Sequence, residues 1–178
     1  MMWRFREHPN MIKVFAYSTT PVAIVMKLHE LGDAKAFVYG KGTAAKEFPY
    51  SKATVLSLIR QYCSGIAYMH QSGFSHNDIK PGNILLDVDV NGQLMPVICD
   101  FGISRVINAS SLKVAAFNAS EVRGASTAYA APEVLYGLRN RVPEQDPRNW
   151  MARDIFALGI SIEEMIQRVR PWGKKSAT

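Results

Sequence analysis

Three short polar motifs in a fixed order constrain this chain more than any other feature. They are His76-Asn77-Asp78-Ile79-Lys80-Pro81-Gly82-Asn83, Asp100-Phe101-Gly102 and Ala131-Pro132-Glu133. Apolar runs follow the first motif and precede the second, and the pair Asn91-Gly92 between these runs suits the positive backbone angles of a tight hairpin turn. The spacing therefore predicts a hairpin that brings Asn83 and Asp100 to neighbouring strand ends.

The length and composition are those of one globular domain. The chain has 178 residues, of which 48% are hydrophobic and 20% are charged, enough to bury a sizeable core. No run approaches the roughly 18 consecutive apolar residues that a membrane helix needs. Residues 1–8 also lack the apolar stretch of a signal peptide. We therefore expect a protein of the cytoplasm or nucleus that has no membrane contact.

The charge and the cysteines exclude two further classes. The formal net charge is +6 and the isoelectric point is near 9.4, but the basic residues are dispersed, with a mild concentration from Arg168 to Lys175. A solvated surface is favoured over a nucleic-acid interface. Cys63 and Cys99 are too few for a disulfide framework and belong to no zinc-binding pattern.

Local patterns predict a mixture of antiparallel strands and helices. Residues 11–17 and 21–28 are rich in branched and aromatic side chains and flank a turn at residues 18–20, which indicates a hairpin. A long helix is expected between the N-cap Ser51 and Gly73. Its apolar face is predicted to consist of Leu56, Ile59, Cys63, Ile66 and His70.

The second half of the chain predicts another helix after a long loop. Residues 104–128 are rich in Ser, Ala and Asn without steady periodicity, as in a loop. Helical spacing returns over residues 153–168, with an apolar face of Ile155, Leu158, Ile162 and Met165.

Together, the three motifs resemble the catalytic loop, the magnesium-binding turn and the end of the activation segment of a eukaryotic-type protein kinase. Aminoglycoside-type kinases share the H-x-D-x-x-x-x-N frame but lack Lys80-Pro81, the Phe-Gly after Asp100 and the Ala-Pro-Glu triplet. Lys80 in this place resembles the serine/threonine-directed branch. The resemblance implies an ATP-dependent protein kinase acting on a protein Ser/Thr hydroxyl.

The resemblance also implies a fold and its boundaries. The expected class is α+β, a protein kinase-like fold formed mainly by the helical large lobe, with the hinge and the last small-lobe strands. Residues 1–29 would be a small-lobe remnant and hinge, and residues 30–178 the large lobe without its last helices. The segment from Asp154 to Gly159 looks like the helix that anchors the catalytic loop.

By resemblance, four residues carry the chemistry. Asp78 lies in the position of the catalytic base, which orients the substrate hydroxyl and accepts its proton. Lys80 would steady the transferring phosphate. Asn83 is counted with these catalytic residues and, with Asp100, offers the hard oxygen ligands that Mg²⁺ demands.

The nucleotide site is implied in the same way. Met26 matches the residue that guards the adenine pocket, and Lys27 to His29 match the hinge, whose backbone groups would hold adenine. Leu85 resembles the floor of that pocket. Val14, His76 and Phe101 match three members of the stacked column that supports active kinases.

The sequence departs from the family pattern in four features. Neither a phosphate-covering glycine loop nor a V-A-I-K lysine precedes the motifs, and the glutamate partner of that lysine is not found either. Asn77 replaces the arginine that in many kinases pairs with a phosphorylated activation loop. We therefore expect little kinase activity from these residues alone.

Three hypotheses follow. The first is a protein serine/threonine kinase, present here as a fragment of its catalytic domain, with ATP and Mg²⁺ as cofactors. The second is a truncated pseudokinase, a non-catalytic module that binds a partner kinase, a scaffold or a substrate. The third is a fragment or a mispredicted gene product.

Overall fold

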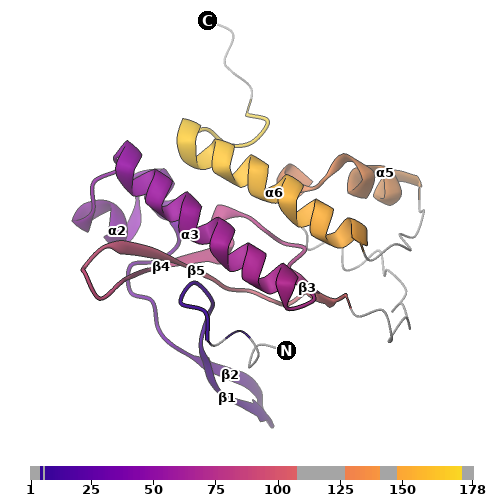
Figure 1. Cartoon of the computed structure of the whole chain (residues 1–178), viewed down its shortest axis with the longest axis horizontal. Helices are drawn as coiled ribbons and strands as arrows, with labels where there is room; N and C mark the ends of the chain where they lie inside the picture. The colour runs from indigo at the N-terminus through magenta and orange to yellow at the C-terminus, as the bar shows by residue number, and fades with distance from the viewer. Residues whose placement is uncertain (1–4, 6, 108–126, 141–147, 174–178) are drawn as a thin grey trace, which may run out of the picture. The chain divides into compact units, whose positions relative to one another are not determined.

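The computed structural model describes Phe5 and residues 7–107, 127–140 and 148–173 (Figure 1). The chain divides into two compact units. The first comprises Met1–Met69 and Pro81–Asp100, and the second comprises His70–Lys80 and Phe101–Thr178. In the described part of the chain, no helix combines the length and the apolar character needed to cross a membrane.

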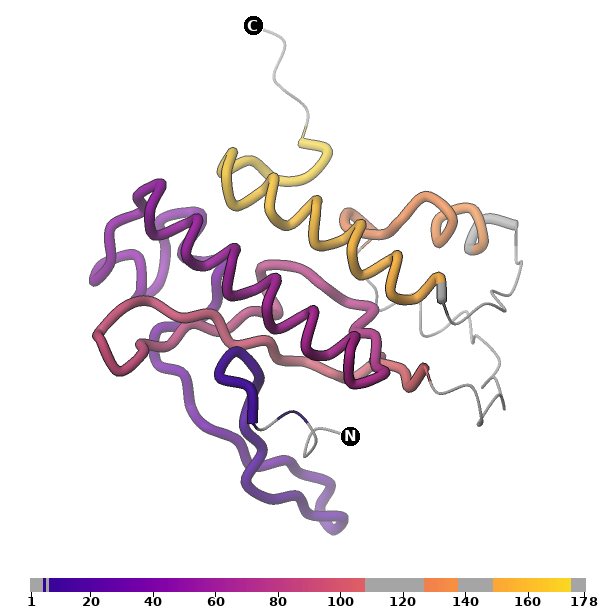
Figure 2. The backbone as a smooth tube through the Cα atoms, in the orientation of Figure 1, coloured from indigo at the N-terminus to yellow at the C-terminus, as the bar shows by residue number. Residues whose placement is uncertain are grey.

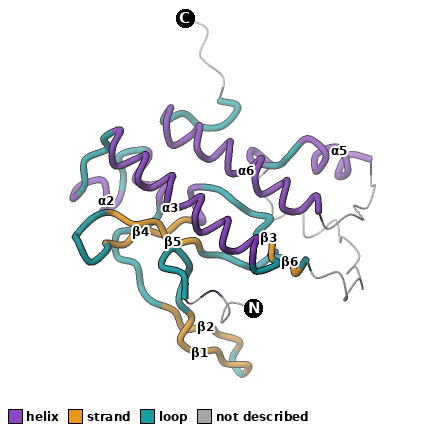
Figure 3. Tube along the Cα trace, viewed as in Figure 1, coloured by secondary structure: helices purple, strands orange, loops and turns teal. Residues whose placement is uncertain are grey.

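Helices and short antiparallel strands make up both units (Figure 3). The first unit contains β1 (Val14–Thr19), β2 (Val22–Met26), α1 (Ala34–Val38), α2 (Gly42–Glu47), α3 (Lys52–Gln71) as far as Met69, the short 3-10 helix η2 (Pro81–Asn83), β4 (Ile84–Val88) and β5 (Leu94–Ile98). The second contains β3 (Phe74–Ser75), β6 (Arg105–Val106), η3 (Thr127–Tyr129), α5 (Pro132–Asn140) and α6 (Arg148–Gln167). The predicted α+β class is confirmed. The predicted boundary between a small-lobe remnant with the hinge (residues 1–29) and the large lobe (residues 30–178) stays a prediction.

The first predicted hairpin is present as β1 and β2, which pair in antiparallel register. The turn lies at Thr20-Pro21, later than predicted, and Pro21 suits a turn because it has no N–H to donate to the ladder. Nearly every side chain of the two strands is exposed, and Val22 reaches 89%. The apolar residues of this hairpin are therefore available for contact with other polypeptide.

The second predicted hairpin is also confirmed, because β4 and β5 pair over their whole length. Asp89 organises its turn, since its Oδ1 accepts hydrogen bonds from the N–H groups of Asn91, at 2.8 Å, and Gln93, at 2.9 Å. Gly92 has a φ of 73°, whereas Asn91 keeps a negative φ. The turn is therefore wider than the two-residue turn that the Asn-Gly pair predicted.

The helix α3 has the predicted ends. The Oγ of Ser51 accepts a hydrogen bond from the N–H of Thr54 at 3.1 Å, and Gly73, with a φ of 79°, follows the last turn. The buried residues are Val55, Leu58, Tyr62, Gly65, Ile66 and Met69. The prediction for Leu56 is wrong, because its side chain is 49% exposed. Both series have helical spacing, so periodicity alone did not separate them.

The helix α3 and the strand β5 (Figure 1) approach closely at Gly65, which gives a testable prediction. A Cβ at this position would lie 2.6 Å from Cδ1 of Ile98 and 3.3 Å from Cβ of Asn10. Gly65→Ala should lower the free energy of unfolding by about 1–3 kcal/mol, because overpacking outweighs the gain in helix propensity. Urea denaturation measures the change.

The matched control for this prediction is Gly159→Ala in the helix α6. A Cβ at Gly159 would meet no described atom within 4 Å. The same substitution should therefore raise stability by up to about 1 kcal/mol. Equal effects of the two substitutions would contradict the packing explanation.

The helix α6 begins before the predicted residue 153 and buries a partly polar face. Its buried residues include Asp154, Ala157, Leu158, Ser161, Glu164 and Met165. The prediction for Ile155 is wrong, because this side chain is 55% exposed. Apolar periodicity did not identify this face because three of its positions are polar. Of the predicted loop over residues 104–128, residues 108–126 lie outside the described part.

Candidate active site

The predicted catalytic residues of the second unit lie together. The Nζ of Lys80 donates a hydrogen bond to Oδ2 of Asp78 at 2.6 Å. The side chain of Asp78 is 10% exposed and that of Lys80 is 22% exposed. The N–H of Asp78 also donates to Nδ1 of His76 at 3.3 Å. The arrangement presents a carboxylate that can accept a hydroxyl proton, directly beside a cation that can neutralise a phosphate.

Asp154 of α6 anchors the backbone of the turn that carries Asp78. Its two carboxylate oxygens accept hydrogen bonds from the N–H groups of His76 and Asn77, each at 2.7 Å. The Nε2 of His70 lies 2.9 Å from Oδ2 of the same carboxylate. Asp154 is 1% exposed. The anchoring role that the resemblance implied for this helix is thus visible as three contacts to one buried carboxylate.

Asn77 has a positional role that the sequence did not reveal. It adopts the left-handed conformation, with a φ of 66°, which Asn tolerates better than most residues. Its Nδ2 donates to Oγ of Ser75 at 3.0 Å and to the carbonyl of Ile103 at 3.2 Å. The amide therefore ties the turn to the segment that follows the Asp-Phe-Gly motif, where the family pattern would place an arginine.

Two members of the expected stacked column touch each other. The rings of His76 and Phe101 have centroids 5.1 Å apart at an angle of 44°. The Oγ of Ser104 also donates to the carbonyl of His76 at 3.2 Å. Val14, the third member, belongs to the first unit and is 6% exposed.

The expected magnesium residues lie at neighbouring strand ends of the first unit. Asn83 precedes β4 and Asp100 follows β5, and the N–H of Cys99 donates to the carbonyl of Asn83 at 3.0 Å. Asp100 has a φ of 63°. One amide oxygen and one carboxylate fit Mg²⁺, which often takes one or two protein ligands and leaves the remaining positions to water and phosphate. The described residues contain no cluster of three or more His, Cys, Asp or Glu that could hold a metal.

The predicted hinge residues contact β4 of the same unit through their side chains. Figure 2 traces the backbone of both segments. The Nζ of Lys27 donates to Oδ2 of Asp87, and Nδ1 of His29 lies 3.3 Å from the same oxygen. Met26 ends β2 and is 43% exposed. Leu85 lies on β4 and is half-buried. Residues two apart on a strand share a face, so Leu85 and Asp87 both face the side that the hinge occupies.

Sequence reasoning missed Asp87. The available signal was its place two residues after Leu85, on the face assigned to the adenine pocket. Predicted site residues are thus brought together in three groups: Asp78 with Lys80 in the second unit, and Asn83 with Asp100 and Lys27 with His29 in the first.

Burial and charge shift two ionisable groups near the hinge. Burial lowers the pKa of His29, and the negative charge of Asp87 opposes this effect while Lys27 adds to it. Burial acts to raise the pKa of Asp87, but the hydrogen bonds from Lys27 and the N–H of Val88, with the nearby charges, hold that pKa below its ordinary value. The lowered pKa of His29 favours its neutral imidazole, and the lowered pKa of Asp87 favours its carboxylate.

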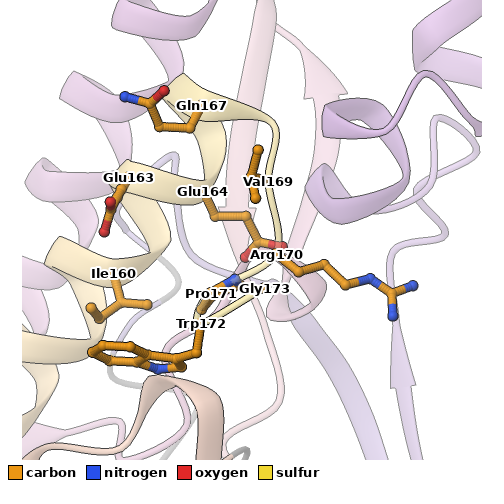
Figure 4. A pocket seen from close by; sticks show the side chains of 9 residues that line it. All are labelled: Ile160, Glu163, Glu164, Gln167, Val169, Arg170, Pro171, Trp172 and Gly173. Atoms are coloured by element: carbon orange, nitrogen blue, oxygen red, sulfur yellow. The ribbon is translucent and has the colours of Figure 1, made fainter. Parts of the chain in front are cut away.

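A separate cavity of about 380 Å³ lies at the end of α6 (Figure 4). It is lined by Ile160, Glu163, Glu164, Gln167, Val169, Arg170, Pro171, Trp172 and Gly173. Glu164 accepts a hydrogen bond from the hydroxyl of Tyr129, and Nε1 of Trp172 donates to the carbonyl of Ala128 at 2.7 Å. None of the predicted site residues lines this cavity.

The family model and the relatives that match this chain are all protein kinases. The family model described as protein kinase domain matches residues 1–178. The mitogen-activated protein kinase kinase kinase bck1 of Aspergillus fumigatus is 30% identical over 172 residues, which are 96% of this chain and 9% of that protein. The corresponding kinase MCK1 of Pyricularia oryzae is 35% identical over 133 residues, 74% of this chain and 8% of that protein.

A human relative gives a similar result. Human mitogen-activated protein kinase kinase kinase 7 is 31% identical over 170 residues, which are 93% of this chain and 24% of that protein. The chain thus spans a quarter or less of the length of these relatives.

Proposed function

The chain belongs to the protein kinase family, and from that premise we propose that it carries the phosphotransfer residues of an ATP-dependent protein serine/threonine kinase. The observation that carries the proposal is the pair Asp78 and Lys80, 2.6 Å apart on a turn held by a buried carboxylate. Lys80 at this place supports a serine or threonine hydroxyl as the acceptor.

Each residue has a defined task in this proposal. Asp78 would orient the acceptor hydroxyl of a protein substrate and take its proton as the oxygen bonds to the terminal phosphorus of ATP and the bond from that phosphorus to ADP breaks. Lys80 offsets negative charge on the transferring phosphoryl group. Asn83 and Asp100 would hold Mg²⁺, which supplies charge neutralisation on the phosphate oxygens when bound. Met26, Leu85 and the backbone of residues 27–29 would receive adenine.

Free backbone donors support the adenine assignment. Within the described residues, the N–H groups of Leu28 and His29 form no hydrogen bond. Leu28 is 77% exposed, so this part of the backbone is open to a ligand. Unpaired donors beside an apolar floor are what recognition of a planar base requires.

The substrate is proposed only as a class. The relatives' names describe kinases that act on a mitogen-activated protein kinase kinase. We extend to this chain a protein substrate with a Ser/Thr hydroxyl, with a further kinase or a scaffold as partner.

Magnesium-dependent nucleotide binding tests the proposal. Titration of the 178-residue chain with a fluorescent ADP analogue should show binding that strengthens when Mg²⁺ is added. Asp100→Asn should remove most of this Mg²⁺ dependence, because an amide replaces the anionic ligand while Asn still tolerates the positive φ. The control Glu47→Gln removes an exposed carboxylate at the end of α2 and should change nothing.

A non-catalytic binding module is the second candidate, favoured by the exposed apolar side chains of the β1–β2 hairpin. This candidate predicts no Mg²⁺-dependent nucleotide binding and no effect of Asp100→Asn. Binding that depends on both Mg²⁺ and Asp100 would exclude it as the whole function.

A further inference from the structure

One carboxylate on β4 contacts two of the three hinge residues. We call residues 27–29 the hinge segment. Asp87 accepts a hydrogen bond from Nζ of Lys27 and lies 3.3 Å from Nδ1 of His29. Its side chain is 16% exposed, whereas that of Lys27 is 50% exposed and that of His29 only 3%. Asp87 therefore contacts both the exposed Lys27 and the buried His29. These contacts hold the hinge segment against β4, the strand that carries the expected pocket floor Leu85.

In the part of the chain that the structure describes, backbone hydrogen bonds hold the hinge segment only at its ends. The N–H of Lys27 donates to the carbonyl of Lys13 at 3.4 Å, a long bond. After the segment, the N–H of Gly32 donates to the carbonyl of His29 at 3.2 Å, and the N–H of Leu86 donates to the carbonyl of Gly32 at 2.8 Å. Within the described residues, no backbone bond restrains Leu28 or the N–H of His29. Side-chain contacts must therefore fix the direction of these free donors.

His29 shows that the segment is packed against β4 rather than lying loosely over it. Among the described residues its imidazole nitrogens are buried and form no hydrogen bond, although Nδ1 lies within ion-pair reach of Asp87. A buried polar ring without hydrogen bonds is unfavourable, because it loses its contacts with water and gains none in return. The burial of this ring indicates a position set by the surrounding contacts, of which Asp87 is the negatively charged one.

We propose that Asp87 is a positioning residue for nucleotide binding: by holding Lys27 and His29 against β4, it fixes the backbone donors that receive adenine. The inference rests on the proposed function, because it assumes that the hinge segment meets the base. Asp87 itself touches no reacting atom in this scheme. It acts through the conformation of Leu28 and His29.

The simplest alternative is an ordinary surface ion pair between Lys27 and Asp87. Exposed pairs of this kind contribute little to stability and little to backbone order. Two measurements separate this alternative from a positioning role. One follows the hinge segment without any nucleotide, and the other compares ligands with and without adenine.

The central variant is Asp87→Asn, which preserves size and removes the charge. Its matched control is Glu30→Gln, because Glu30 is an exposed carboxylate next to the hinge segment with no described hydrogen bond. Both variants change the net charge equally. Lys27→Met tests the same contact from its other end if Asp87→Asn fails to fold.

The first readout is the titration of His29, followed by NMR without nucleotide. The charged groups that face His29 are Asp87 on β4 and Lys27 on the hinge segment itself. Because the charge of Asp87 raises the pKa of His29, Asp87→Asn should lower that pKa further, whereas Glu30→Gln should leave it unchanged. Hydrogen exchange at the amides of Lys27 and Gly32 should become about two- to tenfold faster in Asp87→Asn.

The second readout is binding with Mg²⁺ of ADP and of inorganic tripolyphosphate, which has no base. Asp87→Asn should weaken ADP binding about three- to tenfold and leave tripolyphosphate binding unchanged, since it acts through the adenine contact alone. Asp87→Glu, which keeps the charge, should restore part of the loss.

The outcomes are distinct. An unchanged His29 titration and unchanged exchange in Asp87→Asn would overturn the positioning role even if ADP binds. Equal weakening of ADP and tripolyphosphate would also overturn it. Failure of the unmodified chain to bind ADP would instead count against the proposed function, and the two nucleotide-free measurements would still decide whether Asp87 holds the hinge segment.

Discussion

Asp154→Ala should lower the free energy of unfolding by about 3–5 kcal/mol, a large part of the stability of a domain of this size. The carboxylate of Asp154 is 1% exposed and accepts the N–H groups of His76 and Asn77. Removing it leaves two backbone donors and the ring of His70 without their acceptor, and each unsatisfied buried donor costs about 1–3 kcal/mol. Denaturant unfolding of the two proteins measures the difference.

Two further variants make this prediction specific. Asp154→Asn keeps one acceptor oxygen but places an NH₂ group against a backbone N–H, so its loss should be smaller than that of alanine yet clearly measurable. Glu163→Gln removes an exposed carboxylate from the same helix and should change stability by less than about 0.5 kcal/mol. If alanine at position 154 is no more harmful than Glu163→Gln, the carboxylate does not anchor the turn.

Elements with strong local signals were predictable from the sequence. The turn signal at Asn91-Gly92 located the β4–β5 hairpin, and with it the proximity of Asn83 and Asp100. Ser51 and Gly73 marked the ends of α3 because capping and left-handed glycine conformations have local causes.

Faces and long-range polar contacts were not predictable in this way. Two helical series fitted α3 equally well, and the one containing Leu56 was wrong because tertiary packing selects the face. The strand pattern could place Asp87 on the face of Leu85, but it could not reveal the pair with Lys27, which forms only once the chain has folded. Asn77 departed from the family pattern in the sequence, but its hydrogen bond to the carbonyl of Ile103 depends on the fold.

Asp78→Asn should reduce phosphoryl transfer by about 10²–10⁴-fold, the usual contribution of a positioned general base. An amide is nearly isosteric with the carboxylate but cannot accept the hydroxyl proton, and it also removes the anionic partner of Lys80. Transfer of radiolabelled phosphate from ATP to a Ser/Thr protein substrate measures the loss. Mg²⁺-dependent ADP binding should remain, because Asp78 has no place in that step.

The starting rate for this comparison is expected to be low. No glycine loop and no V-A-I-K lysine precede His76 in these 178 residues, and lost positioning groups cost factors of about 100 or more each. Single-turnover conditions at saturating Mg²⁺ and ATP are therefore needed, with Glu47→Gln as the control that should keep the full rate. Fast turnover that disappears in Asp78→Asn would contradict the predicted low rate of the unmodified chain. It would still support Asp78 as the general base. If Asp78→Asn leaves the rate unchanged, Asp78 does not accept the hydroxyl proton and has no place in the mechanism.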